Sequence, residues 1–304
     1  MIVREGPLPM DAPPRSGTPR VSVIVPFLDT PSPFLEEAVQ SVHSQTFREW
    51  EILLVNDGSG PEASSTAEGL ASDDPTRIRL LEHPEGANRG VAASRSLGLR
   101  HARGDLLACL DSDDVWKPRK LEEQVRIMDA APHVGMIFGR SLYWHSWNPD
   151  AVEEDYLHEL GVPDGTEMAP GDFLLRFLRH QVIVPIPSAV MARAALVRSV
   201  GGFGDLRSIY EDQGFYARMS THGIVRACAD VWNLYRIHPG SACARADRGQ
   251  RRTARAEFLD QVHRQLLEDG VMPAPLRRTL RIERWATRVP WGPQVVRLLR
   301  QLGA

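Results

Sequence analysis

Lysine is almost absent from this sequence. Only Lys117 and Lys120 are lysines among its 36 basic residues, so the other 34 are arginines. The 304 residues include 39 acidic side chains, and the formal net charge is -3. Because nucleic-acid binding needs an excess of basic charge, this balance argues against a general nucleic-acid-binding protein. The arginine excess has two readings: codon bias from a GC-rich genome, or a need for the forked donors of the guanidinium group.

Cysteines and long apolar runs are also scarce. The three cysteines are Cys109, Cys228 and Cys243, and none forms a C-x-x-C pair. This argues against a disulfide framework or a structural zinc site and predicts a reducing compartment. No apolar run approaches the roughly 20 residues of a membrane-spanning helix, and the N-terminus lacks the apolar core of a secretory signal. We therefore expect a cytoplasmic protein, and peripheral contact with the inner face of a membrane stays open.

The first half of the chain alternates regularly between strand and helix patterns. Short apolar runs predict strands over 21–25, 51–55, 77–81 and 105–110, and helical spacing of apolar residues predicts helices over 33–46, 61–72 and 89–102. This alternation predicts βαβ units and a parallel sheet with helices on both faces. In such sheets, ligands bind beyond the carboxyl ends of the strands.

The second half is less regular. Strands are predicted at 136–138 and 189–191, with an antiparallel orientation as one option, and helices at 211–220 and 250–269. Between them, residues 141–170 form a long polar segment with two tryptophans.

The segment Asp111-Ser-Asp-Asp114 is the strongest chemical signal because it directly follows a predicted strand. Residues two apart in an extended chain point to the same side, so Asp111 and Asp113 can face one ligand. Two neighbouring carboxylates repel each other unless a cation compensates. Mg²⁺ and Mn²⁺ prefer oxygen ligands and often bridge substrate phosphates. The alternative is that Asp114 caps a helix that begins near Lys117.

Two further polar segments follow predicted strands. In Val55-Asn-Asp-Gly-Ser59, Asp57 can accept a base N–H or a ribose hydroxyl, although these residues also form turns. In Asn88-Arg-Gly-Val-Ala-Ala-Ser-Arg95, the glycine permits close approach of the backbone, and the two arginines can bind diphosphate oxygens. The sequence has no G-x-G-x-x-G and no Walker lysine, which argues against a dinucleotide or P-loop site.

Together these segments resemble the nucleotide-diphospho-sugar glycosyltransferases of family 2, which have the GT-A fold. The matching segments, in chain order, are Val21–Pro26, Ser41–Thr46, Glu51–Ser59, Asn88–Arg95, Gly104–Asp114, and Val200–Phe203 followed by Tyr210–Arg218. The resemblance covers residues 21–245 and departs from the family pattern at Asp29, at Gly60-Pro61 and at Ser96. These departures leave the contacts with the donor nucleotide open and do not affect the carboxylates.

The resemblance implies an α/β protein with a Rossmann-like, central, mostly parallel sheet flanked by helices. We expect a disordered tail over 1–20, a catalytic domain over 21–245 and a basic helical extension over 246–304. Within the domain, residues 21–115 would bind the nucleotide sugar and residues 116–245 the acceptor.

The end of the extension is basic. Residues 271–304 carry seven arginines and one glutamate, a net charge of +6, together with Trp285, Trp291 and a helical apolar pattern over 295–299. Such a segment either packs on the catalytic domain or a partner subunit, or lies on an anionic membrane. Self-association also stays open.

The resemblance further implies an inverting, metal-dependent transfer from an NDP-sugar, with UDP- and dTDP-sugars favoured, to a hydroxyl of a glycan, lipid-linked or small-molecule acceptor. Asp212 would be the general base, with Glu211 beside it, and Asp111, Asp113 and His238 would hold Mg²⁺ or Mn²⁺. The residues assigned to the nucleotide sugar are Pro26, Phe27, Asp29, Asp57, Asn88, Arg89, Gly90, Arg95, Asp111 and Ser112.

Four assignments in the second half are less definite. Trp144 and Trp147 would stack on the acceptor or pack against the domain, and Ser188 would lie on the acceptor side. Arg236 either contacts the diphosphate or is a surface residue.

Two other functions stay open. An NDP-sugar nucleotidyltransferase would need a glycine-rich loop where this sequence has Phe27-Leu-Asp-Thr30. A degenerate glycosyltransferase that only binds or scaffolds would have lost its acidic motifs, and both motifs are present.

Overall fold

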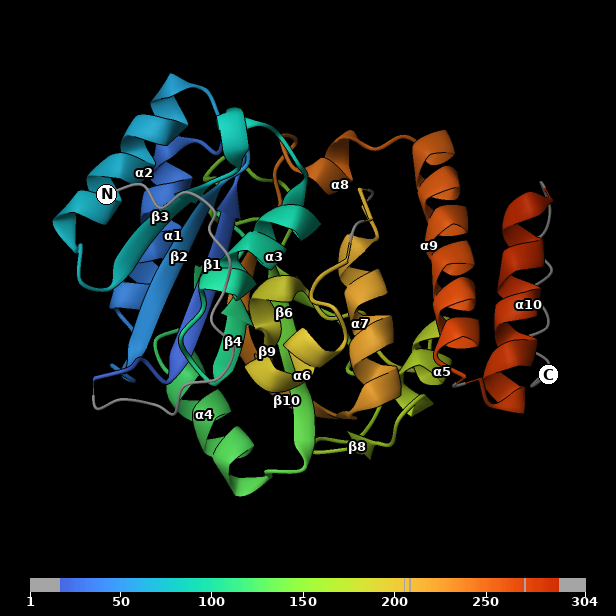
Figure 1. The fold of residues 1–304 in the computed structure, drawn as a ribbon. Coiled ribbons are helices and arrows are strands. Elements are labelled where there is room, and N and C mark those ends of the chain that lie inside the picture. The colour runs from blue at the N-terminus through green and yellow to red at the C-terminus, as the bar shows by residue number, and fades with distance from the viewer. Residues whose placement is uncertain (1–16, 205, 208, 271, 290–304) are drawn as a thin grey trace.

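A computed structural model describes residues 17–204, 206–207, 209–270 and 272–289 of the chain (Figure 1). The strands are β1 (Val21–Phe27), β2 (Trp50–Asn56), β3 (Ile78–Glu82), β4 (Leu106–Cys109), β5 (Val115–Trp116), β6 (Val134–Trp144), β7 (Tyr156–Leu157), β8 (Glu167–Met168), β9 (Val190–Arg193) and β10 (Ile224–Arg236). The α-helices are α1 (Ser32–His43), α2 (Pro61–Asp73), α3 (Val91–His101), α4 (Lys120–Ala130), α5 (Asp172–Leu178), α6 (Ala194–Ser199), α7 (Glu211–His222), α8 (Ala242–Arg245), α9 (Arg248–Glu268) and α10 (Ala274–Arg288).

The strands form one central sheet in the order β3-β2-β1-β4-β9-β6-β10-β5, with β7 beside β6 and β8 beside β10. The four strands β3, β2, β1 and β4 are parallel to one another. Strand β9 is antiparallel to both β4 and β6, whereas β10 runs parallel to β6. The βαβ units predicted for the first half are confirmed, and so is the antiparallel orientation of the strand near residue 190.

Each face of the sheet is covered by its own apolar core. Val23 and Val25 of β1 belong to the core shared with α1, α2 and α4, and Ile24 belongs to the core shared with α3, α5, α7 and α9. All three side chains are fully buried, because successive residues of a strand point to opposite faces and both faces carry helices. Burial of one such side chain stabilises the fold by about 1.5–3 kcal/mol.

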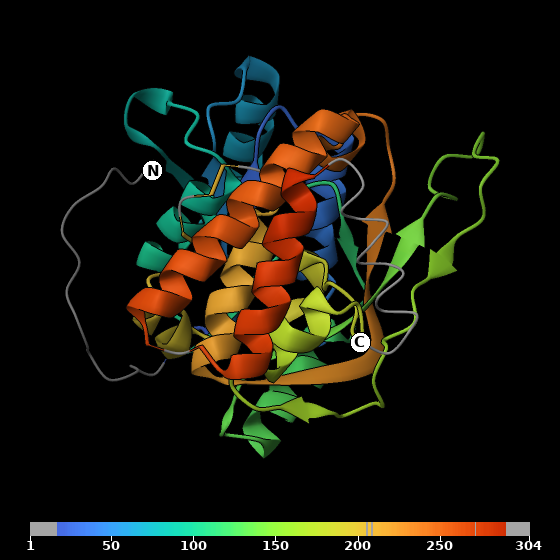
Figure 2. The same ribbon diagram turned by 90° about the vertical axis from the view of Figure 1, so that its right-hand side faces the viewer.

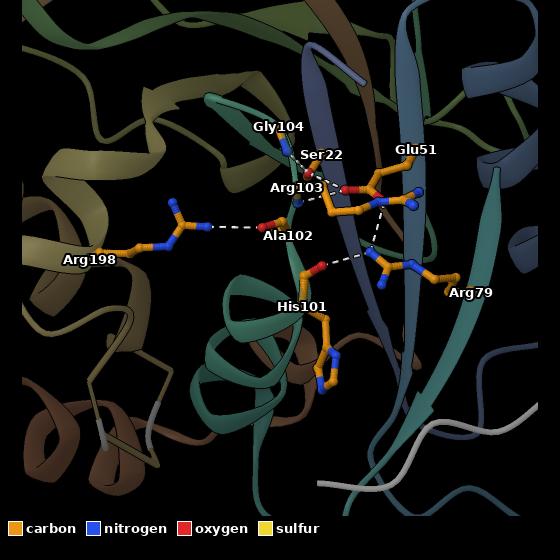
Figure 3. A network of polar contacts seen from close by, with 8 residues as sticks. All are labelled: Ser22, Glu51, Arg79, His101, Ala102, Arg103, Gly104 and Arg198. Atoms are coloured by element: carbon orange, nitrogen blue, oxygen red, sulfur yellow. Dashed lines mark hydrogen bonds and ion pairs between the residues drawn. The ribbon is translucent and has the colours of Figure 1, made fainter. Parts of the chain in front are cut away.

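The amino ends of the strands are held together by a buried carboxylate (Figure 3). Glu51, at the start of β2, is only 1% exposed. It accepts hydrogen bonds from the Ser22 hydroxyl (2.6 Å), the Arg79 guanidinium (2.7 Å), and both the backbone N–H and the Nε of Arg103 (2.8 Å each). This network fixes the starts of β1, β2 and β3 at the edge of the sheet opposite to that where ligands bind.

The C-terminal helices α9 and α10 form an antiparallel pair outside α5 and α7 (Figures 1 and 2). Leu276, Leu280 and Ala286 of α10 are at most 4% exposed, so this helix packs on the domain, as one of the two readings of the extension predicted. The apolar pattern over 295–299 and most of the predicted N-terminal tail lie outside the described residues. Among the helices of the described ranges, none combines the length and the apolar character needed to cross a membrane.

Candidate active site

The loops that follow β1, β2 and β4 meet at one edge of the sheet. After β2, the Asn56 side chain accepts a hydrogen bond from the backbone N–H of Ser59 (2.8 Å), which closes the predicted turn. Gly58 has a φ of +87°, and a Cβ there would lie 2.8 Å from the carbonyl oxygen of Gly86. Only glycine fits this position, because the turn after β2 packs directly on the loop before α3.

Asp57 anchors that second loop. Its carboxylate is 4% exposed and accepts hydrogen bonds from the backbone N–H groups of Arg89 (2.8 Å) and Gly90 (3.0 Å). His83 Nε2 lies 3.6 Å from the same carboxylate. Asp57 therefore holds the start of α3 against β2, a role that the sequence analysis did not foresee. Its predicted contact with a nucleoside base stays a prediction.

The other residues assigned to the donor differ in exposure. Asn88, Arg89 and Asp29 are exposed at this edge, whereas Pro26 and Phe27 are buried in β1. The Phe27 ring is part of the core on the α1 side, and the predicted contact of this residue with the nucleotide sugar stays a prediction. A cavity of about 390 Å³ adjoins the exposed part of this loop, and its basic lining residues are His83, Arg89, Arg100 and Arg207.

Two of the residues assigned to the donor form hydrogen bonds with neighbouring loops at the same edge of the sheet. Asp29 accepts a hydrogen bond from the backbone N–H of Gly60 (2.7 Å). The hydroxyl of Ser112, which is 8% exposed, lies 2.7 Å from that of Thr30. The loops after β1 and β4 are thus joined to each other, which fixes the position of the acidic segment that follows β4.

Arg95 joins the two acidic motifs. Its side chain, on α3, is 4% exposed, and it donates to Asp111 Oδ1 (2.6 Å) and to Glu211 Oε1 (3.1 Å). Burial lowers the pKa of Arg95, but the two carboxylates raise it by more, so the group stays charged. Its buried Nε has no hydrogen-bond partner. The guanidinium of Arg95 is thus paired with protein carboxylates in this structure, and its predicted contact with a diphosphate stays a prediction.

The acidic segment after β4 sends its side chains in different directions. Asp111 faces Arg95, and burial followed by the charge of Asp113 raises the pKa of Asp111. Asp113 Oδ2 lies 2.9 Å from Nε2 of His238. Asp114 is fully buried and accepts from the backbone N–H of Arg236 (3.0 Å). The predicted orientation of Asp111 and Asp113 toward one ligand stays a prediction.

The helix-cap alternative for Asp114 is wrong. Helix α4 begins only at Lys120, and its N-terminus has no side-chain cap. Burial, and next the charge of Asp113, raise the pKa of Asp114 well above its ordinary range. Asp114 instead connects the loop after β4 to the end of β10.

Arg236 is the centre of a second buried cluster. It is 3% exposed, its Nε donates to the carbonyl of Asp113 (2.8 Å), and it forms an ion pair with Glu37. Its guanidinium also lies 4.2–5.2 Å from the centroids of three aromatic rings, those of Phe34, Trp144 and Trp147. The surface reading of Arg236 is therefore wrong. The sequence did not indicate that Glu37 and Phe34 contact Arg236, because both lie about 200 residues away from it along the chain.

The residues assigned to the acceptor are tied into the protein. The indole N–H of Trp147 donates to the carbonyl of Ile237 (2.8 Å), and that of Trp144 to the Ser146 hydroxyl (3.2 Å). Both rings pack on Arg236, in agreement with the packing alternative. Ser188 is fully buried, and its hydroxyl accepts from the backbone N–H of Asp111 (3.1 Å). Ser188 thus supports the acidic segment, and its predicted place on the acceptor side stays a prediction.

Glu211 and Asp212 form the first turn of α7. Helix N-termini favour negative charge, so the predicted helical position and a chemical role are compatible. Asp212 Oδ1 accepts from the backbone N–H of Gln213 (2.7 Å). Burial, and next the charge of Glu211, raise the pKa of Asp212 well above its ordinary range. A carboxyl group with a raised pKa is suited to accept a proton near neutral pH.

The described part of the chain contains no group of three or more His, Cys, Asp or Glu side chains arranged to hold a metal ion. The nearest arrangement is Asp113 with His238, next to Asp111. A Mg²⁺ or Mn²⁺ ion commonly uses one or two carboxylates and completes its shell with substrate phosphates and water. Asp111, Asp113 and His238 carry oxygen and nitrogen donors of the kind that such an ion uses, and their role as its ligands stays a prediction.

A mixed sheet whose parallel half ends in an acidic pair after β4, with a second acidic pair at the start of α7, is the arrangement of the GT-A fold. Residues 22–201 match the family described as Glycosyl transferase family 2. The chain belongs to this family.

Individual relatives agree with the family. The putative glycosyltransferase EpsE of Bacillus subtilis is 34% identical over 119 residues, which are 39% of this chain and 42% of the relative. The succinoglycan biosynthesis protein ExoW of Rhizobium meliloti is 26% identical over 170 residues, or 55% of this chain and 48% of the relative. The matches thus span less than half of these relatives.

Solved structures share the fold. The S. aureus TarS 1–349 structure in complex with UDP-GlcNAc has a TM-score of 0.67 at 19% identity, covering 88% of this chain and 72% of that chain. The mannosyltransferase PcManGT from Pyrobaculum calidifontis, in complex with GDP-Man and Mn²⁺, has a TM-score of 0.59 at 21% identity, covering 92% of this chain and 74% of that chain.

Proposed function

We propose that this chain is an inverting glycosyltransferase, which moves a sugar from a nucleoside diphosphate to a hydroxyl group of an acceptor. The observation that carries the proposal is the pair of acidic motifs at one edge of the sheet, bridged by the guanidinium of Arg95. One motif is suited to the leaving diphosphate and the other to the attacking hydroxyl. Family membership supports the same assignment.

Asp212 is the general base of the proposed reaction. The acceptor oxygen attacks the anomeric carbon, the bond from that carbon to the diphosphate breaks, and the hydroxyl proton passes to the Asp212 carboxylate. Attack from the face opposite the diphosphate inverts the configuration at the anomeric carbon. Glu211 stays paired with Arg95 and raises the proton affinity of its neighbour.

Asp111, Asp113 and His238 are the residues that would hold Mg²⁺ or Mn²⁺ next to the diphosphate. When bound, such an ion neutralises the charge that develops on the leaving group. Asp111 keeps one oxygen on Arg95, and Arg236 holds the backbone of Asp113, so the chain itself fixes the direction of both carboxylates.

We propose a UDP- or dTDP-sugar as donor, bound along the loop that Asp57 holds in place. Asn88, Arg89 and Gly90 of this loop would contact the nucleotide, and Arg89 also lines the basic cavity. The TarS complex contains UDP-GlcNAc, which supports a uridine donor. The PcManGT complex contains GDP-Man, so GDP-mannose is the alternative donor to test. The acceptor would be a glycan, a lipid-linked sugar or a small molecule with a free hydroxyl.

A panel of UDP-, dTDP- and GDP-sugars, each with Mg²⁺, Mn²⁺ or chelator, tests the proposal by thermal shift. A donor present at 100 times its dissociation constant stabilises the folded state by about 2.7 kcal/mol. Release of NDP by the stabilising donor in the presence of acceptors then identifies the reaction. Pyrophosphate formation would instead identify a nucleotidyltransferase, and binding without any turnover a scaffold.

Removal of the Asp113 carboxylate should weaken the binding of donor only when metal is present. For Asp113→Ala, we expect the metal-dependent affinity for the donor to fall by at least about tenfold, or 1.4 kcal/mol. Titration calorimetry with Mn²⁺ and with chelator measures this difference. Asp73→Ala, at an exposed position of α2, is the matched control. Unchanged affinity of Asp113→Ala in Mn²⁺ would refute the metal assignment.

Replacement of Glu211 should shift the pH profile of the reaction. A base acts when deprotonated, so kcat rises with pH through the pKa of Asp212. Burial raises that pKa most, and Glu211 raises it further. Glu211→Gln removes the second cause, so the acid limb of the profile of kcat against pH should move to lower pH. We expect this shift whether or not the maximal kcat changes. A limb that stays in place or moves upward would contradict the role of Asp212.

A further inference from the structure

The outward face of α10 is basic. Apart from Ala274 and Pro275 at its start, its exposed residues are Arg277, Arg278, Arg281, Trp285 and Arg288, which we call the basic face. With 3.6 residues per turn, all five fall within an arc of about 100° around the helix axis.

The opposite side of α10 is already used by packing. Leu276, Thr279, Leu280, Glu283 and Ala286 are all buried. The apolar side of this amphipathic helix is therefore not available to a partner, and what remains outside is charge with one aromatic ring. Trp285 is 40% exposed between the arginines.

The charge of the basic face is largely uncompensated. Within the ranges that the structure describes, no carboxylate lies within ion-pair distance of Arg277, Arg278 or Arg281, whereas Arg288 pairs with Asp260 of α9 (3.2 Å). Such a patch attracts anions over about one Debye length, which is roughly 8–10 Å at physiological salt.

The buried side of α10 is linked through α9 to the first turn of α7. The Nε of Arg252 donates to the carbonyl of Thr287 (2.8 Å), and Arg255 reaches both Glu283 (3.4 Å) and Gln213 (3.3 Å). Gln213 follows Asp212 in the first turn of α7. The C-terminal end of α10 is therefore the end that lies toward the site, and Figure 2 shows α10 as an outer layer of the molecule.

We propose that the basic face binds the surface of an anionic lipid bilayer. Arginines near such a surface are attracted by acidic headgroups, and tryptophan favours the interface between headgroups and acyl chains. The basic face lies on one side of one helix, which a flat bilayer surface can contact. A nucleic acid would need a wider basic surface than this chain of net charge -3 offers. The docking itself does not depend on the proposed transfer reaction.

Flotation with vesicles tests the proposal on the full chain. Wild-type protein should float with vesicles of phosphatidylcholine mixed with phosphatidylglycerol, and not with phosphatidylcholine alone. Each arginine near an anionic surface contributes about fivefold in affinity, so the triple variant R277Q/R278Q/R281Q should bind about a hundredfold more weakly. Trp285→Ala should weaken binding at high salt, where the electrostatic part is screened.

A matched control removes the same charge elsewhere. The variant R48Q/R119Q/R126Q also replaces three exposed arginines, which lie before β2, just before α4 and in α4, and should float like wild type. Thermal melts of all variants check the fold. Equal loss in both triple variants, no flotation of wild type, or binding to soluble dextran sulfate without binding to acidic vesicles would each overturn the proposal.

Discussion

Asp212→Asn should bind the donor sugar as tightly as the wild-type chain and fail to transfer it. The amide has nearly the same shape as the carboxyl group, so the hydrogen bond from the Gln213 backbone survives, but it cannot take the proton from the attacking hydroxyl. General-base catalysis contributes about 10²- to 10⁴-fold, so kcat should fall by that factor. Calorimetry of donor binding and single-turnover NDP release measure the two parts separately.

The comparison with Glu211→Gln decides which carboxyl group is the base. Because Glu211 is paired with Arg95 at 3.1 Å, we expect its amide variant to retain more turnover than Asp212→Asn does. Asp73→Asn provides a control for an exposed aspartate. Wild-type turnover in Asp212→Asn, or a larger loss in Glu211→Gln, would transfer the assignment to Glu211.

Arg95→Met should destabilise the whole fold. The substitution keeps much of the side-chain volume but leaves Asp111 and Glu211, whose side chains are 24% and 13% exposed, without their common cation. Breaking a buried ion pair by removing one partner costs about 3–5 kcal/mol. Chemical denaturation should show this loss as a lower midpoint. The two acidic motifs would also separate, and donor binding would weaken with the same variant.

Two further substitutions test whether the bridge itself matters. Arg198→Met removes an arginine that donates to one backbone carbonyl, that of Ala102 (2.9 Å), and should cost only about 1 kcal/mol. Arg95→Lys keeps the charge but cannot reach two carboxylates with a forked group, so its stability should lie between those of wild type and Arg95→Met. If Arg95→Lys matches wild type in both stability and turnover, the bridge has no role beyond its charge.

The elements of the first half could be predicted because their signals are local. The apolar run over 21–25 became β1, and the helix expected over 89–102 became α3 over Val91–His101. Side-chain periodicity decides between strand and helix within a few residues, and both patterns agree with burial on a sheet covered from both sides. Most boundaries moved by only one or two residues, and the helix expected over 33–46 ends three residues earlier, at His43.

The candidate site was predictable as a set of motifs but not as a set of contacts. The motif after β4 carries Asp111, and the motif at the start of α7 carries Glu211, as expected. From the sequence we expected Arg95 to bind a diphosphate. In the fold its guanidinium lies between Asp111 and Glu211, which are 16 and 116 residues away from it along the chain. The hydrogen bond from the Asp111 backbone to Ser188 was likewise not predictable, because it depends on strands that pair only in three dimensions.

The shortage of lysine also has a clearer meaning in the fold. Arg79 and Arg103 share Glu51, Arg95 bridges two carboxylates, and Arg236 binds a carbonyl and a carboxylate at once. Each of these places uses several guanidinium N–H groups, which the point charge of a lysine cannot replace. Codon bias can supply arginine, and the fold then depends on its geometry.

The sequence by itself determined the family, the order of strands and helices in the first half, and the acidic residues available for chemistry, since each of these is written in short segments. The tertiary structure alone decided which of those acids is paired, buried or raised in pKa. The physical reason is that a charge is tuned by whatever lies within a few ångströms of it, and at this edge of the sheet those neighbours come from β4, α3, α7 and β10 together.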